Sequence, residues 1–233
     1  MNAVLINKKI NHLLRYFVLK IQTMIQHKII PNSSDSGAGI APIENYLNHQ
    51  KSRRESAIIL FHDVQTGMYT VAGGMRNQNE DIEDTARREG KEESANLFRF
   101  PKTIMNESFA VRHRNFVVYF VGLQSPIMSN YYDDNVKTLK NNGAPHDYLE
   151  TDKMVRVYIS DLEQAGVRTV AGNILCNDAN GNQIEIEGRT KAVIREALNA
   201  GFIPSLPINI PRVNGNFNDS NQPHLRGTKC YFL

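Results

Sequence analysis

The segment with the clearest chemistry lies between Gly74 and Leu97, where glutamates recur at short intervals beside a pair of arginines. On a helix, Glu89, Glu92 and Glu93 would project from one face, because residues three and four apart are neighbours. Like charges placed this way repel by about a few tenths of a kcal/mol per exposed pair. A hard divalent cation, which prefers oxygen ligands, would offset the repulsion. The segment therefore predicts a metal site suited to a polyphosphate.

This spacing resembles the Nudix box, the signature of hydrolases that cleave nucleoside diphosphates linked to another group. The pattern G-x5-E-x7-R-E-x-x-E-E is carried by Gly74, Glu80, Arg88, Glu89, Glu92 and Glu93. A solvated, charge-rich helix face is the alternative, since many such runs are no more than that. Six residue types at fixed offsets favour the box.

The resemblance implies a fold and a reaction. The fold would be an α/β/α sandwich with a mixed β-sheet, and the reaction would be Mg²⁺- or Mn²⁺-dependent hydrolysis of a pyrophosphate bond. The metal ligands would be Glu89, Glu92, Glu93 and the carbonyl oxygen of Gly73. The alternative function is a Nudix-fold module that binds a nucleotide or a protein partner without turning it over.

The resemblance also implies catalytic roles. Arg88 would pair with Glu92 or Glu80 and orient the carboxylates rather than touch the substrate. Relatives differ in their general base, so the candidates are a box glutamate, Glu92 or Glu93, and a glutamate from a later loop. The best later candidate is Glu150, which precedes a predicted strand; an ordinary exposed loop carboxylate is the alternative.

The end of the box departs from the pattern. Gly90 stands where a small apolar residue is usual, and Ala95 and Asn96 stand where glycine and an aliphatic residue are usual. Glycine inside a helix costs up to about 1 kcal/mol and is tolerated where another backbone packs closely. Alanine adopts positive φ poorly, so we expect the helix to run one residue longer and to end on Asn96.

Three arginines are candidates for binding substrate phosphates. Arg112 and Arg114 belong to a basic cluster at a predicted hairpin turn, and Arg54 precedes the first predicted strand; solvated surface positions are the alternative. The substrate itself stays open among nucleoside triphosphates, dinucleoside polyphosphates, inositol pyrophosphates and capped RNA. A nucleotide or other small polyphosphate is the expected partner.

The elements around the box are predicted by short apolar runs. Residues 57–61 and 68–71 form a hairpin with a turn at Thr66-Gly67, and the second strand leads into the glycine loop. Asn79 is the expected N-cap of the box helix. The other predicted elements are strands at 107–113, 116–123, 154–159 and 183–187 and a helix at 189–200 ended by Gly201.

Prolines and small polar residues suggest the domain limits. The NSSDSGAG stretch after Pro31 reads as a linker, which places a hydrolase domain at residues 35–203. Residues 204–233, rich in proline and asparagine, are expected to form an extended tail without regular elements.

Composition sets broader limits. A chain of 233 residues with 41% hydrophobic and 22% charged residues is typical of a soluble globular protein. The net charge of +3 is too small to argue for nucleic-acid binding. Cys176 and Cys230 have no metal-ligand spacing, which excludes a disulfide framework and a zinc cluster and fits the cytoplasm.

Residues 1–34 form a basic arm without acidic residues, since the first carboxylate is Asp35. Apolar residues recur in it at the period of an amphipathic helix, at Ile6, Ile10, Leu13, Phe17, Ile21 and Met24. The apolar run is too short and too charged to span a membrane. The helix could pack on its own domain or form a homodimer, direct the protein to mitochondria, or attach to an anionic membrane. Translation could also start at Met24.

Overall fold

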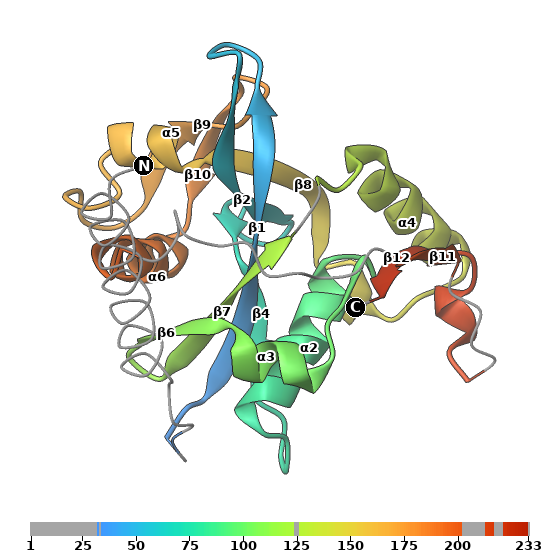
Figure 1. The fold of residues 1–233 in the computed structure, drawn as a ribbon. Coiled ribbons are helices and arrows are strands. Elements are labelled where there is room, and N and C mark those ends of the chain that lie inside the picture. The colour runs from blue at the N-terminus through green and yellow to red at the C-terminus, as the bar shows by residue number, and fades with distance from the viewer. Residues whose placement is uncertain (1–31, 33, 124–125, 202–212, 217–220, 233) are drawn as a thin grey trace, which may run out of the picture. The chain divides into compact units, whose positions relative to one another are not determined.

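The computed structural model of the chain (Figure 1) describes residues 32, 34–123, 126–201, 213–216 and 221–232. The predicted amphipathic helix at residues 6–24 lies outside the described residues, so its proposed roles stay predictions. Within the described residues, Cys176 and Cys230 are buried and form no disulfide. None of the helices in this part of the chain is long and apolar enough to cross a lipid bilayer.

The described residues form a large mixed sheet, a small sheet and helices on both sides. The strands are β1 (Gly37–Asn48), β2 (Arg53–Asp63), β3 (Tyr69–Thr70), β4 (Ala72–Met75), β5 (Phe98–Arg99), β6 (Phe109–His113), β7 (Phe116–Leu123), β8 (Thr151–Tyr158), β9 (Ile174–Asn177), β10 (Gln183–Ile186), β11 (Val213–Asn216) and β12 (Lys229–Phe232). The helices are α2 (Ile82–Glu93), α3 (Lys102–Glu107), α4 (Ser129–Asn141), α5 (Ile159–Gln164) and α6 (Gly188–Asn199).

The large sheet has the order β6-β7-β1-β2-β3-β10-β9, with β4 paired to β1 and β8 paired to β2. Two of its pairings, β1 with β7 and β3 with β10, are parallel, and the others are antiparallel. Helices α2, α3 and α4 lie on one side of these strands, and α5 and α6 lie on the other (Figure 1). The expected α/β/α sandwich with a mixed sheet is confirmed.

Strand β2 shows why the sheet is buried on both faces. Its apolar run is continuous rather than alternating, as expected for a strand covered on both sides. Ile58 and Leu60 join the core cluster that includes Val193 and Leu198 of α6. Phe61 points to the other face, where its ring packs against Phe98 and Tyr132 of α4.

The predicted hairpins at 57–71, 107–123 and around Asn180-Gly181 are confirmed by antiparallel pairing of β2 with β3, β6 with β7, and β9 with β10. The predicted strand at 154–159 corresponds to β8, and the predicted helix at 189–200 to α6, with Gly201 at φ +70°. Helices α3, α4 and α5 had no sequence-based prediction.

The linker interpretation of Gly37, Ala38 and Gly39 is wrong, because these residues begin β1, the strand in the middle of the large sheet. The backbone approaches β4 so closely here that a Cβ on Gly39 would lie 2.5 Å from the carbonyl oxygen of Ala72. Pro42, which lacks a backbone donor, falls where β1 changes its antiparallel neighbour from β4, paired up to Ile40, to β2.

The expectation of a tail without regular elements over residues 204–233 also differs from the structure. Strands β11 and β12 pair with each other, and β12 pairs in parallel with β5. Asn135 of α4 fixes this small sheet, since its side chain accepts from the N–H of Lys229 at 2.6 Å and donates to the carbonyl of Ala95 at 2.9 Å. The C-terminal segment is therefore packed against the end of the box helix.

Candidate active site

The glycine loop and the box helix are joined by close backbone packing. Gly73 lies opposite Gly39 in the β1–β4 register, and a Cβ on Gly73 would lie 2.6 Å from the Cα of Gly39. A Cβ on Gly74 would lie 2.5 Å from Oε1 of Glu89. Both glycines are therefore required by space, the first for the sheet and the second for the carboxylate of α2.

The box helix begins two residues later than expected. Its N-cap is Asp81, whose side chain accepts from the N–H of Asp84 at 2.8 Å, and Asn79 lies outside the helix at φ 67°. Glu80 does not cap the helix, and one of its oxygens accepts from the hydroxyl of Thr85 at 3.0 Å. Of the two acidic residues that precede the helix, Asp81 therefore caps it, and Glu80 belongs to the site.

Arg88 is the centre of the box. Its Nε donates to Glu80 at 3.0 Å, and its Nη1 donates to Glu89 at 2.7 Å and to Glu92 at 3.0 Å. Its Nη2 donates to the carbonyl of Met75 at 2.8 Å. The planar guanidinium thus joins three carboxylates to the glycine loop, which is the orienting role expected for it.

Replacing Arg88 by alanine should lower the free energy of unfolding by about 2–4 kcal/mol, because three partly buried carboxylates would lose their common cation. For a chain of this size the melting temperature should fall by about 5–12 °C, measured by thermal unfolding. The control is Arg87→Ala on the same helix, whose ion pair with Asp84 at 2.7 Å is more exposed. Arg87 also donates from Nε to the carbonyl of Phe100 at 2.7 Å, so this variant should cost about 1 kcal/mol, less than Arg88→Ala. Equal losses for the two variants would contradict the central role of Arg88.

Burial changes the acidity of the box glutamates. Burial raises the pKa of Glu89 to about 7 despite the adjacent Arg88 guanidinium. Burial also raises the pKa of Glu92, and Arg88 opposes that rise. For Glu80, burial raises the pKa, but the hydrogen bonds from Arg88, the N–H of Asn77 and Thr85 together with the charge of Arg88 outweigh it, so the pKa is lowered. The carboxylates at the far end of the box are thus the ones that are costly to ionise without a further cation.

Glu93 is the most deeply placed of these carboxylates. Its side chain accepts a hydrogen bond from the N–H of Gly73 at 2.9 Å, which ties the helix to the glycine loop. Burial raises the pKa of Glu93 well above its usual value, and the nearby negative charges of Glu89 and Glu150 add to the rise. Glu93 and Glu150 both line the cavity described below, and their shared role in one site stays a prediction.

The end of the box helix is not as expected. The helix stops at Glu93 with Ser94 as C-cap, and both Ala95 and Asn96 have positive φ, at 51° and 64°. The N–H of Ala95 donates to the carbonyl of Glu92, and that of Asn96 donates to Lys91. This is a Schellman motif with alanine at the left-handed position, so the prediction of a longer helix is wrong.

Replacing Ala95 by glycine should raise the free energy of unfolding by about 0.5 kcal/mol. Left-handed strain costs alanine about 1–2 kcal/mol, whereas the buried methyl contributes only about 0.8 kcal/mol. The matched control is Ala86→Gly, a fully buried position inside the same helix. It should destabilise by about 2 kcal/mol, because helix propensity and the methyl are both lost. Urea unfolding of both variants measures the difference, and a loss of stability in Ala95→Gly would show that packing outweighs strain.

Gly90, the other departure, packs against a side chain rather than a backbone. A Cβ on Gly90 would lie 2.5 Å from Cδ1 of Ile40 on β1. The larger side chain on the strand therefore occupies the space that a small apolar residue in the helix would otherwise take.

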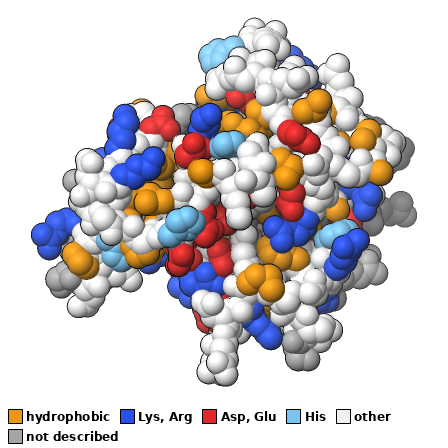
Figure 2. All heavy atoms as spheres, turned by 180° about the vertical axis from the view of Figure 1, so that it is seen from behind, with side chains coloured by type: hydrophobic (Ala, Val, Ile, Leu, Met, Phe, Trp, Pro, Cys, Tyr) orange, Lys and Arg blue, Asp and Glu red, His pale blue; other side chains and the backbone are white. Residues whose placement is uncertain are grey.

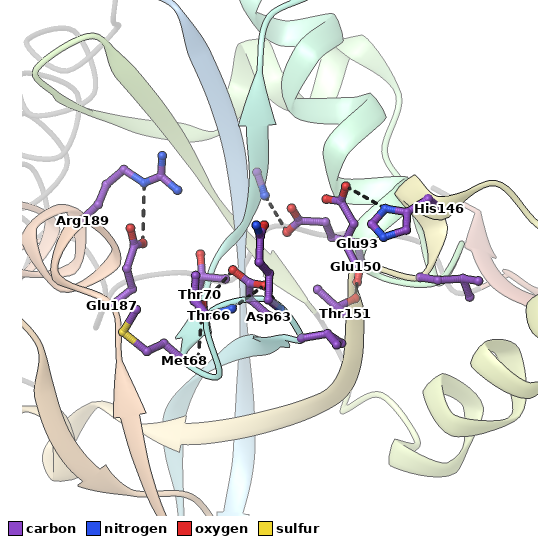
Figure 3. A pocket seen from close by; sticks show the side chains of 14 residues that line it. Asp63, Thr66, Met68, Thr70, Glu93, His146, Glu150, Thr151, Glu187 and Arg189 are labelled. Carbon is purple, nitrogen blue, oxygen red and sulfur yellow. Dashed lines mark hydrogen bonds and ion pairs between the residues drawn. The ribbon is translucent and has the colours of Figure 1, made fainter.

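A cavity of about 550 Å³ opens beside the box. Its described lining includes Gly73 and Glu93, the loop residues His146 and Glu150, and polar residues from the β2–β3 turn. Figure 3 shows the carboxylates of Glu93 and Glu150 lying side by side, with His146 next to Glu150. The contact between His146 Nδ1 and Glu150 Oε1 is 3.5 Å, and both side chains are exposed to solvent. The structure thus brings the later-loop candidate to the box.

The three predicted phosphate-binding arginines are not among the described residues that line this cavity. Arg112 forms a two-point contact with buried Asp35, at 2.8 Å for each hydrogen bond. Arg54 donates to the carbonyl of Asn45 at 2.9 Å, and Arg114 occupies the exposed β6–β7 turn at φ 57°. Arg112 and Arg54 hold backbone and sheet in place, so the structure does not support their assignment to substrate.

Sequence reasoning missed Glu187 and Arg189, which lie on another wall of the cavity (Figure 3). Their signal was present but weak: Glu187 ends the predicted strand at 183–187, and Arg189 begins the predicted helix at 189–200. Strands β3 and β10 run in parallel, so the residues that follow them meet at one edge of the sheet. Asp63, at the end of β2, also lines the cavity and caps its turn by accepting from the N–H of Gln65 at 2.7 Å.

Carboxylates gather near the middle of the face seen in Figure 2, with histidine and basic side chains around them.

No known family profile matches the chain, and no curated protein matches it. Solved structures that resemble it include a MutT/nudix family protein from Enterococcus faecalis, with 13% identity, 78% of this chain and 68% of that one covered, and a TM-score of 0.39.

Two further similar structures were found. A C. elegans Ap4A hydrolase has 14% identity over 71% of this chain and 98% of its own, with a TM-score of 0.38. A mutT/nudix family protein from Listeria innocua has 13% identity over 71% and 90%, with a TM-score of 0.36. Sequence identities and TM-scores this low support no conclusion about the function of this chain. The described residues thus combine an α/β/α sandwich, a glycine loop and an acidic helix centred on Arg88, which is the combination that the Nudix resemblance predicts.

Proposed function

We propose that this protein is a metal-dependent pyrophosphohydrolase of the Nudix type. The observation that supports it most is the placement of the box carboxylates: Arg88 gathers Glu89 and Glu92, and Glu93 lies at a cavity wall beside Glu150. The substrate class is a nucleoside diphosphate linked to another group, or a related small polyphosphate.

The residues present fit a hard divalent cation. Arg88 contacts Oε1 of Glu89 and Oε2 of Glu92, so each carboxylate has its other oxygen to offer. Gly74 leaves the space that Glu89 occupies, and burial disfavours the anionic forms unless a cation is near. Mg²⁺ or Mn²⁺ would be held by Glu89, Glu92, Glu93 and the carbonyl of Gly73. When bound, such an ion neutralises phosphate oxygens and lowers the pKa of a water molecule.

Residues of the protein orient the metal-binding carboxylates and accept the proton of the attacking water. The N–H of Gly73 holds Glu93 in place, and Arg88 keeps its neighbouring carboxylates on one side of the helix. A water oxygen forms the new bond to phosphorus while the bond from phosphorus to the bridging oxygen breaks. Glu150 accepts the proton from the attacking water, and Glu92 or Glu93 is the alternative base.

The test is a panel of nucleoside triphosphates, dinucleoside polyphosphates, nucleotide sugars, inositol pyrophosphates and capped RNA, each assayed with Mg²⁺, Mn²⁺ or a chelator. The reference is the double variant Glu89→Gln/Glu93→Gln. Turnover that needs the metal and is lost in the double variant is the expected result. Turnover that is equal in the double variant would refute the metal-site assignment.

A panel without turnover but with retained ligand binding would favour a binding module instead. Location in the cytoplasm, with mitochondria as the alternative, and a homodimer through the N-terminal helix are separate proposals. Fractionation of the full chain and its mass in solution test them.

A further inference from the structure

One wall of the cavity carries a positive charge that the proposed reaction has not used. The described lining contains the carboxylates of Asp63, Glu93, Glu150 and Glu187. Among these described lining residues, Arg189 is the one arginine or lysine. Figure 3 shows Arg189 across the cavity from Glu93 and Glu150, on the side of α6. An anionic substrate would therefore have its charge neutralised at two separate places, the metal ion proposed at the box and the guanidinium of Arg189.

Arg189 is held at this wall by the sheet. The N–H of Glu187 donates to the carbonyl of Tyr69 at 3.0 Å, and the N–H of Val71 donates to the hydroxyl of Thr190 at 3.2 Å. These bonds tie the first turn of α6 to the strand that leads into the glycine loop. The N-terminal end of the helix dipole lies on the same wall and also favours an anion.

The ring of Phe116 lies between Arg189 and the glycine loop that precedes the box helix. The guanidinium carbon of Arg189 lies 4.3 Å from the centre of the Phe116 ring. The same ring touches the glycine loop, since its Cζ lies 3.0 Å from where a Cβ on Gly73 would be. One aromatic ring therefore separates the guanidinium from the residue whose N–H holds Glu93.

The guanidinium can engage a ligand. Among the described residues its ion pair is with Glu187, at 3.6 Å, and the side chain is 41% exposed. Exposed pairs of this length are weak, and a guanidinium has five donors in a planar fork that suits phosphate. Packing on Phe116 keeps the fork in place without using those donors.

We propose that Arg189 binds a phosphate outside the scissile diphosphate, so that the preferred substrate is a nucleotide with at least three consecutive phosphates. This rests on the proposed function. The box serves the two phosphates on either side of the bond that breaks. A diphosphate whose two ends are esterified to neutral groups has no further anion for Arg189, whereas a triphosphate or longer chain does.

The test compares a nucleoside triphosphate with a nucleotide sugar, whose diphosphate is esterified at both ends. The variant is Arg189→Met, which keeps an unbranched side chain on Phe116 but removes the charge. Its KM for the triphosphate should rise by about 10- to 100-fold, the range expected for a charge-assisted phosphate contact, with little change in kcat. For the sugar, kcat/KM should change by less than about threefold. Arg189→Lys should recover only part of the loss, because it lacks the fork.

The matched control is Arg195→Ala, which removes an equally exposed arginine from the same helix away from the cavity. Its kinetics should equal those of the parent protein. Equal losses on both substrates in Arg189→Met, or no loss on either, would overturn the proposal. If the parent hydrolyses no member of the full panel, the proposed function fails, and calorimetry of the triphosphate still tests Arg189. Weaker binding by Arg189→Met would support the inference, and unchanged binding would overturn it.

Discussion

Replacing Glu93 by glutamine should lower kcat by about 10³-fold or more on the best substrate of the panel, with the fold intact. The carboxylate is a proposed metal ligand and a candidate base, and general-base catalysis alone contributes about 10²–10⁴-fold. Glutamine can still accept from the N–H of Gly73, so the tie between α2 and the glycine loop should survive. Since the substitution removes one of several neighbouring carboxylates, the metal-free melting temperature should stay equal or rise.

Comparison with Glu150→Gln separates the two candidate bases. If Glu150 accepts the proton and Glu93 holds the metal, Glu150→Gln should lose about 10- to 100-fold in kcat and keep the metal dependence of the parent. The control is Glu83→Gln, the same change in α2 at a position ten residues before Glu93. Glu83 is not among the described residues that line the cavity, so this variant should leave kcat unchanged. Retention of more than a tenth of the activity by Glu93→Gln would contradict its central role.

Replacing Arg156 by methionine should lower the free energy of unfolding by about 3–5 kcal/mol, because it leaves the carboxylate of Glu44 buried without its cation. The two residues lie on β8 and β1 and form a buried ion pair, and both contact the backbone of Ile127. Glu44 accepts from the N–H of Ile127 at 2.9 Å, and Arg156 donates to its carbonyl. The pair therefore fixes the chain just before α4.

The double variant Glu44→Gln/Arg156→Met should lose much less than the sum of the two single variants. Glutamine keeps an acceptor for Ile127, and no buried charge is left alone. We expect a coupling energy of about 2 kcal/mol or more from urea unfolding of the four proteins. The comparison pair is Arg168–Glu163, 2.9 Å apart but exposed, where Arg168→Met should cost less than about 1 kcal/mol. Additive losses at Glu44 and Arg156 would contradict a coupled pair.

Much of the box was predictable because it is local. The offsets of Arg88, Glu89 and Glu92 place them on one helix face whatever surrounds the helix, and the arginine then reaches both carboxylates. The hairpins were predictable for the same reason, since turn residues and alternation act over a few positions. Gly73 and Gly74 before the helix indicated that another group packs closely against the backbone. The sequence did not indicate that these groups are Gly39 and Glu89.

Elements that depend on distant partners were not predictable in this way. The stretch NSSDSGAG was predicted to be a linker, and its last three residues form part of a central strand only because β4 and β7 supply their hydrogen bonds. The C-terminal strands likewise depend on β5 and Asn135, which lie far away in the sequence. Ala95 takes a left-handed conformation that its own preference opposes, because hydrogen bonds of the helix end and the contact with Asn135 determine it.

The sequence by itself therefore determined the acidic helix and its arginine, and through the resemblance to the Nudix box it predicted hydrolysis of a pyrophosphate bond. The tertiary structure decided which other charges share the cavity. It brought Glu150 to Glu93, turned Arg112 toward Asp35, and set Arg189 on the opposite wall. The physical reason is range: helix periodicity acts within a few residues, whereas the position of a loop or a distant helix depends on sheet pairing across the whole domain.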